Sequence, residues 1–160
     1  MADPRRRVSN VFHDDWEELY PPAEGWRSNT RRLAPGQTLG VSVYELLPGQ
    51  AQCPYHFHHG NEECVLVYSG RPTLRTPDGE TTLEPGDVAH FTRGAEGAHQ
   101  LLNRTEEPVR YVIVDAKVSP ELVQYPDSGK IAAMSRETQL YSIHRLDDAV
   151  DYFDGEQPRV

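Results

Sequence analysis

Two histidines separated by a single residue, His56 and His58, are the part of this sequence best suited to metal chemistry. Successive side chains of a β-strand alternate between its two faces, so both imidazoles would point the same way, about 7 Å apart along the strand. Two imidazoles on one face can act together as metal ligands. The spacing therefore predicts a metal site on this face.

A carboxylate and a third histidine follow at positions that can complete the site. The segment His59-Gly60-Asn61 predicts a turn that brings the chain back, so a carboxylate at the start of the next strand can reach the same point. Glu62 and Glu63 both qualify, and they face opposite sides of an extended chain. Further along, His99 opens another predicted strand after a loop with two glycines.

Three imidazoles and one carboxylate can coordinate Fe, Mn, Ni, Cu, Co or Zn and still leave positions for a substrate or water. Open positions are typical of catalytic metal sites rather than structural ones. Without a metal, three imidazoles facing one another in a barrel would need other partners for their polar atoms. We therefore expect one divalent transition metal per chain, namely Fe, Mn, Ni or Zn.

The elements that must position these residues are short strands between residues 39 and 116. Runs of β-branched and aromatic residues alternate there with turn signals, among them Asp78-Gly79, where glycine accepts the positive φ of a tight hairpin. Eight short strands at regular spacing predict an all-β sandwich or barrel. The runs are Val41–Leu47, Gln52–His58, Cys64–Tyr68, Thr73–Thr76, Thr81–Leu83, Val88–Thr92, His99–Asn103 and Val109–Asp115.

The segments on either side of the barrel are more polar. We expect residues 1–38 to form an N-terminal extension, irregular to about residue 36, and residues 117–160 to form a C-terminal extension that packs on the barrel. The residues Tyr125-Pro126-Asp127-Ser128-Gly129 predict a turn. Leu146, Val150 and Phe153 have helical spacing, which gives a weak indication of a helix in the tail.

Two stretches of the sequence resemble the two motifs of the cupin superfamily. They are Gly49…His56-x-His58-x4-Glu63-x6-Gly70 and Gly86-x5-Thr92-x-Gly94…His99-x3-Asn103. The resemblance covers roughly residues 40–116 and implies a double-stranded β-helix, the cupin or jelly-roll barrel. It also implies that His56, His58, Glu63 and His99 are the metal ligands, because the six residues that the motif places before Gly70 select Glu63 over Glu62. The tail is similar to a branch of small bacterial cupins of poorly defined function.

Three positions depart from the usual cupin pattern. Six residues rather than five separate Gly49 from His56, and Thr92 stands where the family often has proline. The loop from Gly94 to His99 is two residues longer than usual, which would widen the loop beside the last ligand and reshape the mouth of the pocket.

Two classes of function are compatible with such a site. The first is an enzyme that acts on a small organic molecule, either by dioxygenase-like oxidation or by isomerisation, epimerisation or decarboxylation with the metal as a Lewis acid. The four ligands would hold the metal rather than transfer protons, and no catalytic residue stands out, although Tyr44, Tyr55, Tyr68 and His90 could serve. The alternative is a small-ligand-binding or sensor cupin without catalysis.

Charge and composition narrow the partners. A net charge of −9 argues against nucleic acid and against an anionic membrane surface, and the basic cluster Arg5–Arg7 lies in a terminus that we expect to be loose. The sequence has neither an apolar membrane-spanning window nor a secretory signal pattern, so we expect a cytoplasmic protein with Cys53 and Cys64 as reduced thiols. A homodimer is expected, because open sheet edges must be covered and small cupins commonly dimerise.

Overall fold

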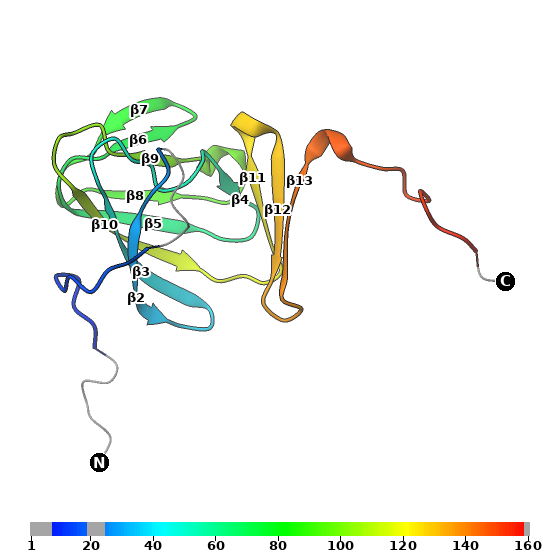
Figure 1. Ribbon diagram of the computed structural model, residues 1–160, viewed down its shortest axis with the longest axis horizontal. Helices are drawn as coiled ribbons and strands as arrows, with labels where there is room; N and C mark the ends of the chain where they lie inside the picture. The colour runs from blue at the N-terminus through cyan, green and yellow to red at the C-terminus, as the bar shows by residue number, and fades with distance from the viewer. Residues whose placement is uncertain (1–7, 19–24, 159–160) are drawn as a thin grey trace, which may run out of the picture.

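A computed structural model of the protein describes residues 8–18 and 25–158 (Figure 1). Within these ranges all paired strands run antiparallel, and the helical segments are three-residue 3-10 turns. The basic cluster Arg5–Arg7 lies outside them. No helix of the described residues is long and apolar enough to cross a membrane.

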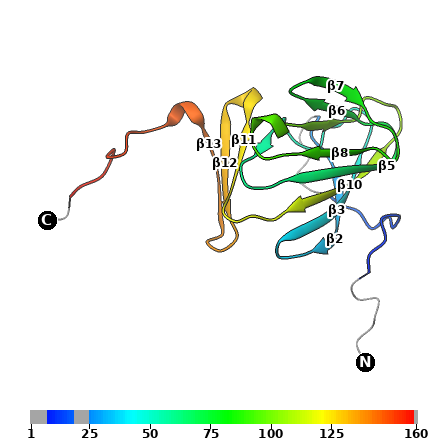
Figure 2. The same cartoon turned by 180° about the vertical axis from the view of Figure 1, so that it is seen from behind.

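Six strands form the largest sheet, in the order β1-β2-β3-β10-β5-β8. A second sheet has the order β7-β6-β9, and a third has the order β13-β12-β11-β4. The third sheet stands at one side of the barrel in both views, and the C-terminal tail leaves from it (Figures 1 and 2). The strand bounds are β1 Glu17–Glu18, β2 Asn29–Pro35, β3 Leu39–Leu46, β4 Phe57–His58, β5 Glu63–Ser69, β6 Thr73–Thr76, β7 Gly79–Thr82, β8 Val88–Phe91, β9 Gln100–Leu102, β10 Val109–Ala116, β11 Glu121–Tyr125, β12 Lys130–Ser135 and β13 Leu140–Arg145.

The main core lies between the first two sheets. Val65 and Val67 of β5 and Tyr111 of β10 are fully buried, and they belong to one cluster with Leu74 of β6 and Leu101 of β9. Alternate side chains of β5 point inward while Leu66 is exposed, which is the period of two expected of a sheet with one buried face. The predicted all-β, double-stranded β-helix fold is confirmed.

Two predicted turns are also confirmed. Asp78-Gly79 joins β6 to β7, and Gly79 has a φ of +122°, a conformation that other residues rarely adopt. The segment from Tyr125 to Gly129 contains the 3-10 turn Pro126–Ser128 between β11 and β12. Gly129 ends this turn in the left-handed region.

The prediction of irregular structure up to residue 36 is wrong for residues 29–35, which form β2. This strand pairs with the edge of β3, where Thr30 donates a hydrogen bond to the Val43 carbonyl at 3.1 Å. Its Arg31-Arg32 pair hid the strand pattern. Arg32 is exposed, whereas Arg31 is buried and donates hydrogen bonds to the Asn10 and His13 carbonyls at 2.8 and 2.9 Å.

The indication of a helix in the tail is also wrong. β11, β12 and β13 lie between residues 121 and 145, and among the described residues after them the helical segment is the 3-10 turn Leu146–Asp148. Val150 and Phe153 lie beyond it and are exposed. The helical spacing of Leu146, Val150 and Phe153 has no buried surface to pack against, because all three side chains are exposed, and an isolated short helix is not stable without such packing.

Candidate metal centre

Backbone pairing places the first and last of the predicted ligands opposite each other. His56 and His99 form an antiparallel bridge, with hydrogen bonds from His56 N to His99 O at 3.2 Å and from His99 N to His56 O at 2.9 Å. His58 ends β4, and Glu63 opens β5 after the turn. The two motifs, far apart in sequence, are thereby brought to one place.

The side chains of all four residues converge. Glu63 Oε1 lies 3.6 Å from His58 Nε2, and Glu63 Oε2 lies 3.2 Å from His99 Nε2. The ligand atoms of His56, His58 and Glu63 lie within 4.8 Å of one another. His99 is outside that tight group but faces the second carboxylate oxygen, so the arrangement could hold one cation.

Of the two neighbouring glutamates, Glu63 points to the histidines and Glu62 points away. The Glu62 carboxylate is exposed and lies 3.4 Å from His90 and 3.6 Å from Arg93. This is the consequence of strand alternation at the start of β5. The structure thus places Glu63, the residue that the cupin spacing selects, beside the histidines.

Each imidazole is held by its Nδ1 atom. His56 Nδ1 donates to the Pro54 carbonyl at 2.9 Å, and His99 Nδ1 donates to the Gly97 carbonyl at 2.9 Å, because a carbonyl can only accept. His58 Nδ1 lies 3.3 Å from a carboxylate oxygen of Glu121. A proton fixed on each Nδ1 leaves the Nε2 lone pairs free, which is the state of a histidine that binds metal through Nε2.

The Nε2 atoms of His58 and His99 face the Glu63 carboxylate. His58 Nε2 is buried and has no hydrogen-bond partner among the described residues. Glu63 Oε1 and Oε2, which face the Nε2 atoms of His58 and His99, are themselves acceptors when the carboxylate is ionised. Nitrogen and carboxylate oxygen atoms that converge in this way can hold a cation between them, so the donor set fits a divalent transition metal.

The protonation states suit this role. Burial raises the pKa of Glu63, but the neighbouring histidines, His99 above all, lower it to about 2, so the carboxylate is ionised at neutral pH. Burial, together with the nearby His99 and His58, lowers the pKa of His56 to about 4 and keeps its imidazole neutral. Neutral imidazoles and an ionised carboxylate are the forms that ligate metals.

The longer loop before His99 folds into the 3-10 turn Ala95–Gly97. Gly94 N donates to the His58 carbonyl at 2.8 Å, and the Gly97 carbonyl holds His99 Nδ1. A Cβ on Gly97 would overlap the Thr92 backbone, so only glycine allows this close packing. The Phe91 ring stacks on His99 with centroids 3.7 Å apart. The two extra residues thus help to orient ligands.

Sequence reasoning missed Glu121, which supports His58 from the C-terminal segment. Its side chain is buried, and its Oε1 also accepts a hydrogen bond from Gly60 N at 3.3 Å. A Cβ on Gly60 would lie 2.5 Å from Glu121 Oε2, so glycine allows the carboxylate to approach. A sequence signal for Glu121 exists, because it alternates with Val123 on the buried face of β11. It could not be used, because β11 itself was not predicted.

A cavity of about 460 Å³ opens above the four residues. Of the residues considered for proton transfer, Tyr44 lines this cavity, whereas Tyr55, Tyr68 and His90 are not among its lining residues. Asp115 also lines it and had not been considered. Burial and the nearby Glu63 raise the pKa of Asp115, and burial raises the pKa of Tyr44.

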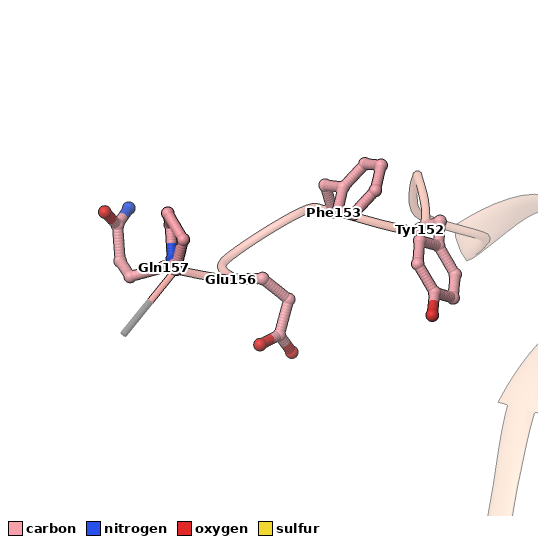
Figure 3. A pocket seen from close by; sticks show the side chains of 5 residues that line it. Tyr152, Phe153, Glu156 and Gln157 are labelled. Atoms are coloured by element: carbon pink, nitrogen blue, oxygen red, sulfur yellow. The ribbon is translucent and has the colours of Figure 1, made fainter. Parts of the chain in front are cut away.

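A second hollow lies along the tail and is built by Tyr152, Phe153, Glu156, Gln157 and Pro158 (Figure 3). All five residues come from one short segment, and no element of the barrel contributes to it. It contains a single carboxylate and no histidine or cysteine. The groups suited to chemistry lie in the barrel cavity instead.

A family model described as a cupin domain matches residues 42–115. The match begins in β3 and ends in β10, and it contains all four clustered residues. Together with the fold, it identifies residues 42–115 as a cupin domain. No curated protein matches the sequence.

Several solved structures are similar to this chain. A provisionally named sugar phosphate isomerase from Acidithiobacillus ferrooxidans has a TM-score of 0.82 and 22% identity, covering 93% of this chain and 98% of that chain. A sugar phosphate isomerase of the cupin superfamily from Silicibacter pomeroyi has a TM-score of 0.74 and 26% identity, covering 88% and 95%. The polyketide cyclase RemF from Streptomyces resistomycificus has a TM-score of 0.57 and 21% identity, covering 71% and 83%. The first two likenesses extend well beyond the cupin domain.

Proposed function

We propose that this protein is a metal-dependent isomerase that acts on a phosphorylated sugar. The observation that carries the proposal is the convergence of three oriented imidazoles on Glu63 at one wall of a cavity large enough for a small metabolite. The likeness to the Silicibacter pomeroyi protein, at 26% identity, supports isomerisation over oxidation or decarboxylation.

His56, His58, Glu63 and His99 would hold one divalent transition metal. Such a metal supplies Lewis-acid polarisation of a bound carbonyl when it is present. The carbonyls of Pro54 and Gly97 hold two of the imidazoles, and the Glu121 carboxylate holds the third. This support keeps the ligands in place between turnovers.

Aldose–ketose isomerisation moves one proton between two neighbouring carbon atoms and another between their oxygens, with no external oxidant or reductant. We assign the transfer of the carbon-bound proton to Asp115. Among the described residues, the carboxylates that line the cavity are Glu63 and Asp115, and Glu63 would hold the metal. Tyr44 keeps its hydroxyl proton at neutral pH, because burial raises its pKa. It can therefore donate a hydrogen bond to a substrate oxygen.

The test is metal analysis of the purified protein, followed by an NMR assay of aldose and ketose phosphates with the metal found. The variant His58→Ala should lose both metal and turnover. His90→Ala is the matched control, since His90 is exposed and faces Glu62 outside the cavity. Full metal loading in the His56→Ala/His58→Ala double variant, or turnover that persists after chelation, would contradict the proposal.

A separate variant tests the proton transfer. Asp115→Asn should retain metal and lose about 100-fold or more in kcat, the usual contribution of a general base. An unchanged kcat in this variant would remove Asp115 from the mechanism without affecting the metal site.

A further inference from the structure

Three cationic side chains line the same cavity as the metal centre. They are Arg32, Lys117 and Arg136. Arg32 and Arg136 are exposed and Lys117 is half-buried, whereas His56 and His99 are buried. The cations therefore lie on the solvent side of the cavity, and the candidate ligands lie on its inner side.

The three cations come from separate parts of the chain. Arg32 belongs to β2, Lys117 follows β10, and Arg136 follows β12. Arg136 Nη1 donates to the Lys117 carbonyl at 3.4 Å, which ties two of these segments together. Because β12 belongs to the C-terminal hairpins, the cluster exists only when those hairpins pack on the barrel.

Gly40 of β3 makes room for Lys117. A Cβ built on Gly40 would overlap the Lys117 side chain and the Asp115 carboxylate, so the absence of a side chain lets both lie over β3. Lys117 N also donates to the Thr38 carbonyl at 2.9 Å. These contacts fix the lysine stem beside the cavity.

Within the part of the chain that the structure describes, the three cations make no direct salt bridge, although Lys117 and Arg136 interact electrostatically with Asp115 of the same cavity. Among the described residues, no salt bridge joins Arg32, Lys117 or Arg136 to a carboxylate. In contrast, carboxylates pair with Arg71, Arg75, Arg104 and Arg110. In a chain with a net charge of −9, three cations outnumber the two carboxylates of this cavity, Glu63 and Asp115, and this excess of positive charge favours a bound anion.

We propose that Arg32, Lys117 and Arg136 form a phosphoryl-binding subsite that holds the charged end of the substrate while its carbonyl end reaches the metal centre. Guanidinium groups offer paired N–H donors that match phosphate oxygens, and a lysine ammonium adds a point charge. Three cations suit a dianionic phosphoryl group better than a carboxylate with a single charge. The subsite rests on the proposed function, since it names how that substrate is held.

Isothermal titration of the metal-loaded protein with inorganic phosphate tests the subsite, with acetate as the comparison anion. Arg136→Gln and Arg32→Gln should each weaken phosphate binding about tenfold, the loss of one charge-assisted hydrogen bond. Arg93→Gln removes a positive charge outside the cavity and should leave the affinity within about twofold. Thermal unfolding and metal content of each variant show whether it is folded and loaded.

Metal-free His58→Ala separates this subsite from the metal centre. It should still bind phosphate, and Arg136→Gln in that background should still weaken binding. Equal affinities for all the arginine variants, an equal loss in Arg93→Gln, or binding that depends only on the metal would overturn the subsite. Phosphate binding that follows the cavity cations without any isomerase activity would instead support the subsite and refute the proposed reaction.

Discussion

The Glu121–His58 contact gives the sharpest prediction for the metal centre. In Glu121→Gln the side chain keeps its shape but loses its negative charge. A charge-assisted hydrogen bond contributes about 1.5–3 kcal/mol. The Nδ1–Oε1 distance of 3.3 Å is longer than the ideal for such a bond, so the lower end applies. This corresponds to metal affinity about tenfold weaker, at about 1.4 kcal/mol for each factor of ten.

The same variant should not destabilise the metal-free protein. Glu121 Oε2 is buried without a hydrogen-bond partner among the described residues, so removing the charge relieves a desolvation cost. A competition titration against a fluorescent chelator gives the metal affinity, and urea unfolding of the chelated protein gives its stability. Loss of affinity without loss of stability identifies Glu121 as a positioning residue for His58.

Two outcomes would refute this reasoning. If the metal affinity of Glu121→Gln lies within about twofold of the wild-type affinity, the Glu121 carboxylate does not orient the His58 imidazole for metal binding. If the metal-free variant is markedly less stable, the role of Glu121 is structural. Glu62→Gln is the matched control, because Glu62 is exposed and points away from the histidines.

Three further predictions follow from the same geometry. Glu63→Gln should weaken metal affinity far more than Glu62→Gln in the same titration, and equal losses would contradict the observed turn. In the metal-free protein, the pKa of the His56 imidazole is about 4 in the folded chain, compared with the ordinary value of 6.5 in the unfolded chain. The unfolded chain therefore binds the proton at a higher pH, and the stability of the folded protein falls as pH drops from 6.5 to 4. Urea midpoints at pH 7.5 and 5.0 should therefore differ more for the wild type than for His56→Gln. We also expect a homodimer in which the tail packs on the partner barrel, because Tyr152 and Phe153 are 89% and 78% exposed. Sedimentation should show a dimer that weakens when residues 150–160 are removed, and a monomeric full-length chain at micromolar concentration would contradict it.

Much of the candidate site could be predicted because its geometry is local. His56 and His58 share a face through strand alternation, and the turn that follows returns Glu63 to the same face. The cupin spacing added His99, and the bridge between His56 and His99 agrees with that choice. Glycines at the turns and the alternating core residues made the all-β fold evident for the same reason.

The remaining features depend on contacts between distant segments. Glu121 reaches His58 only because β11 pairs with β4, and Arg136 reaches the cavity only because β12 pairs with β11. β12 buries only Ala132 and β13 buries no residue, so neither strand has a clear alternation of buried and exposed side chains that its sequence could reveal. The sequence by itself determined the barrel and predicted the four candidate ligands. The tertiary structure decided how the ligands are oriented and which cations surround the cavity, because long-range strand pairing has no local signature.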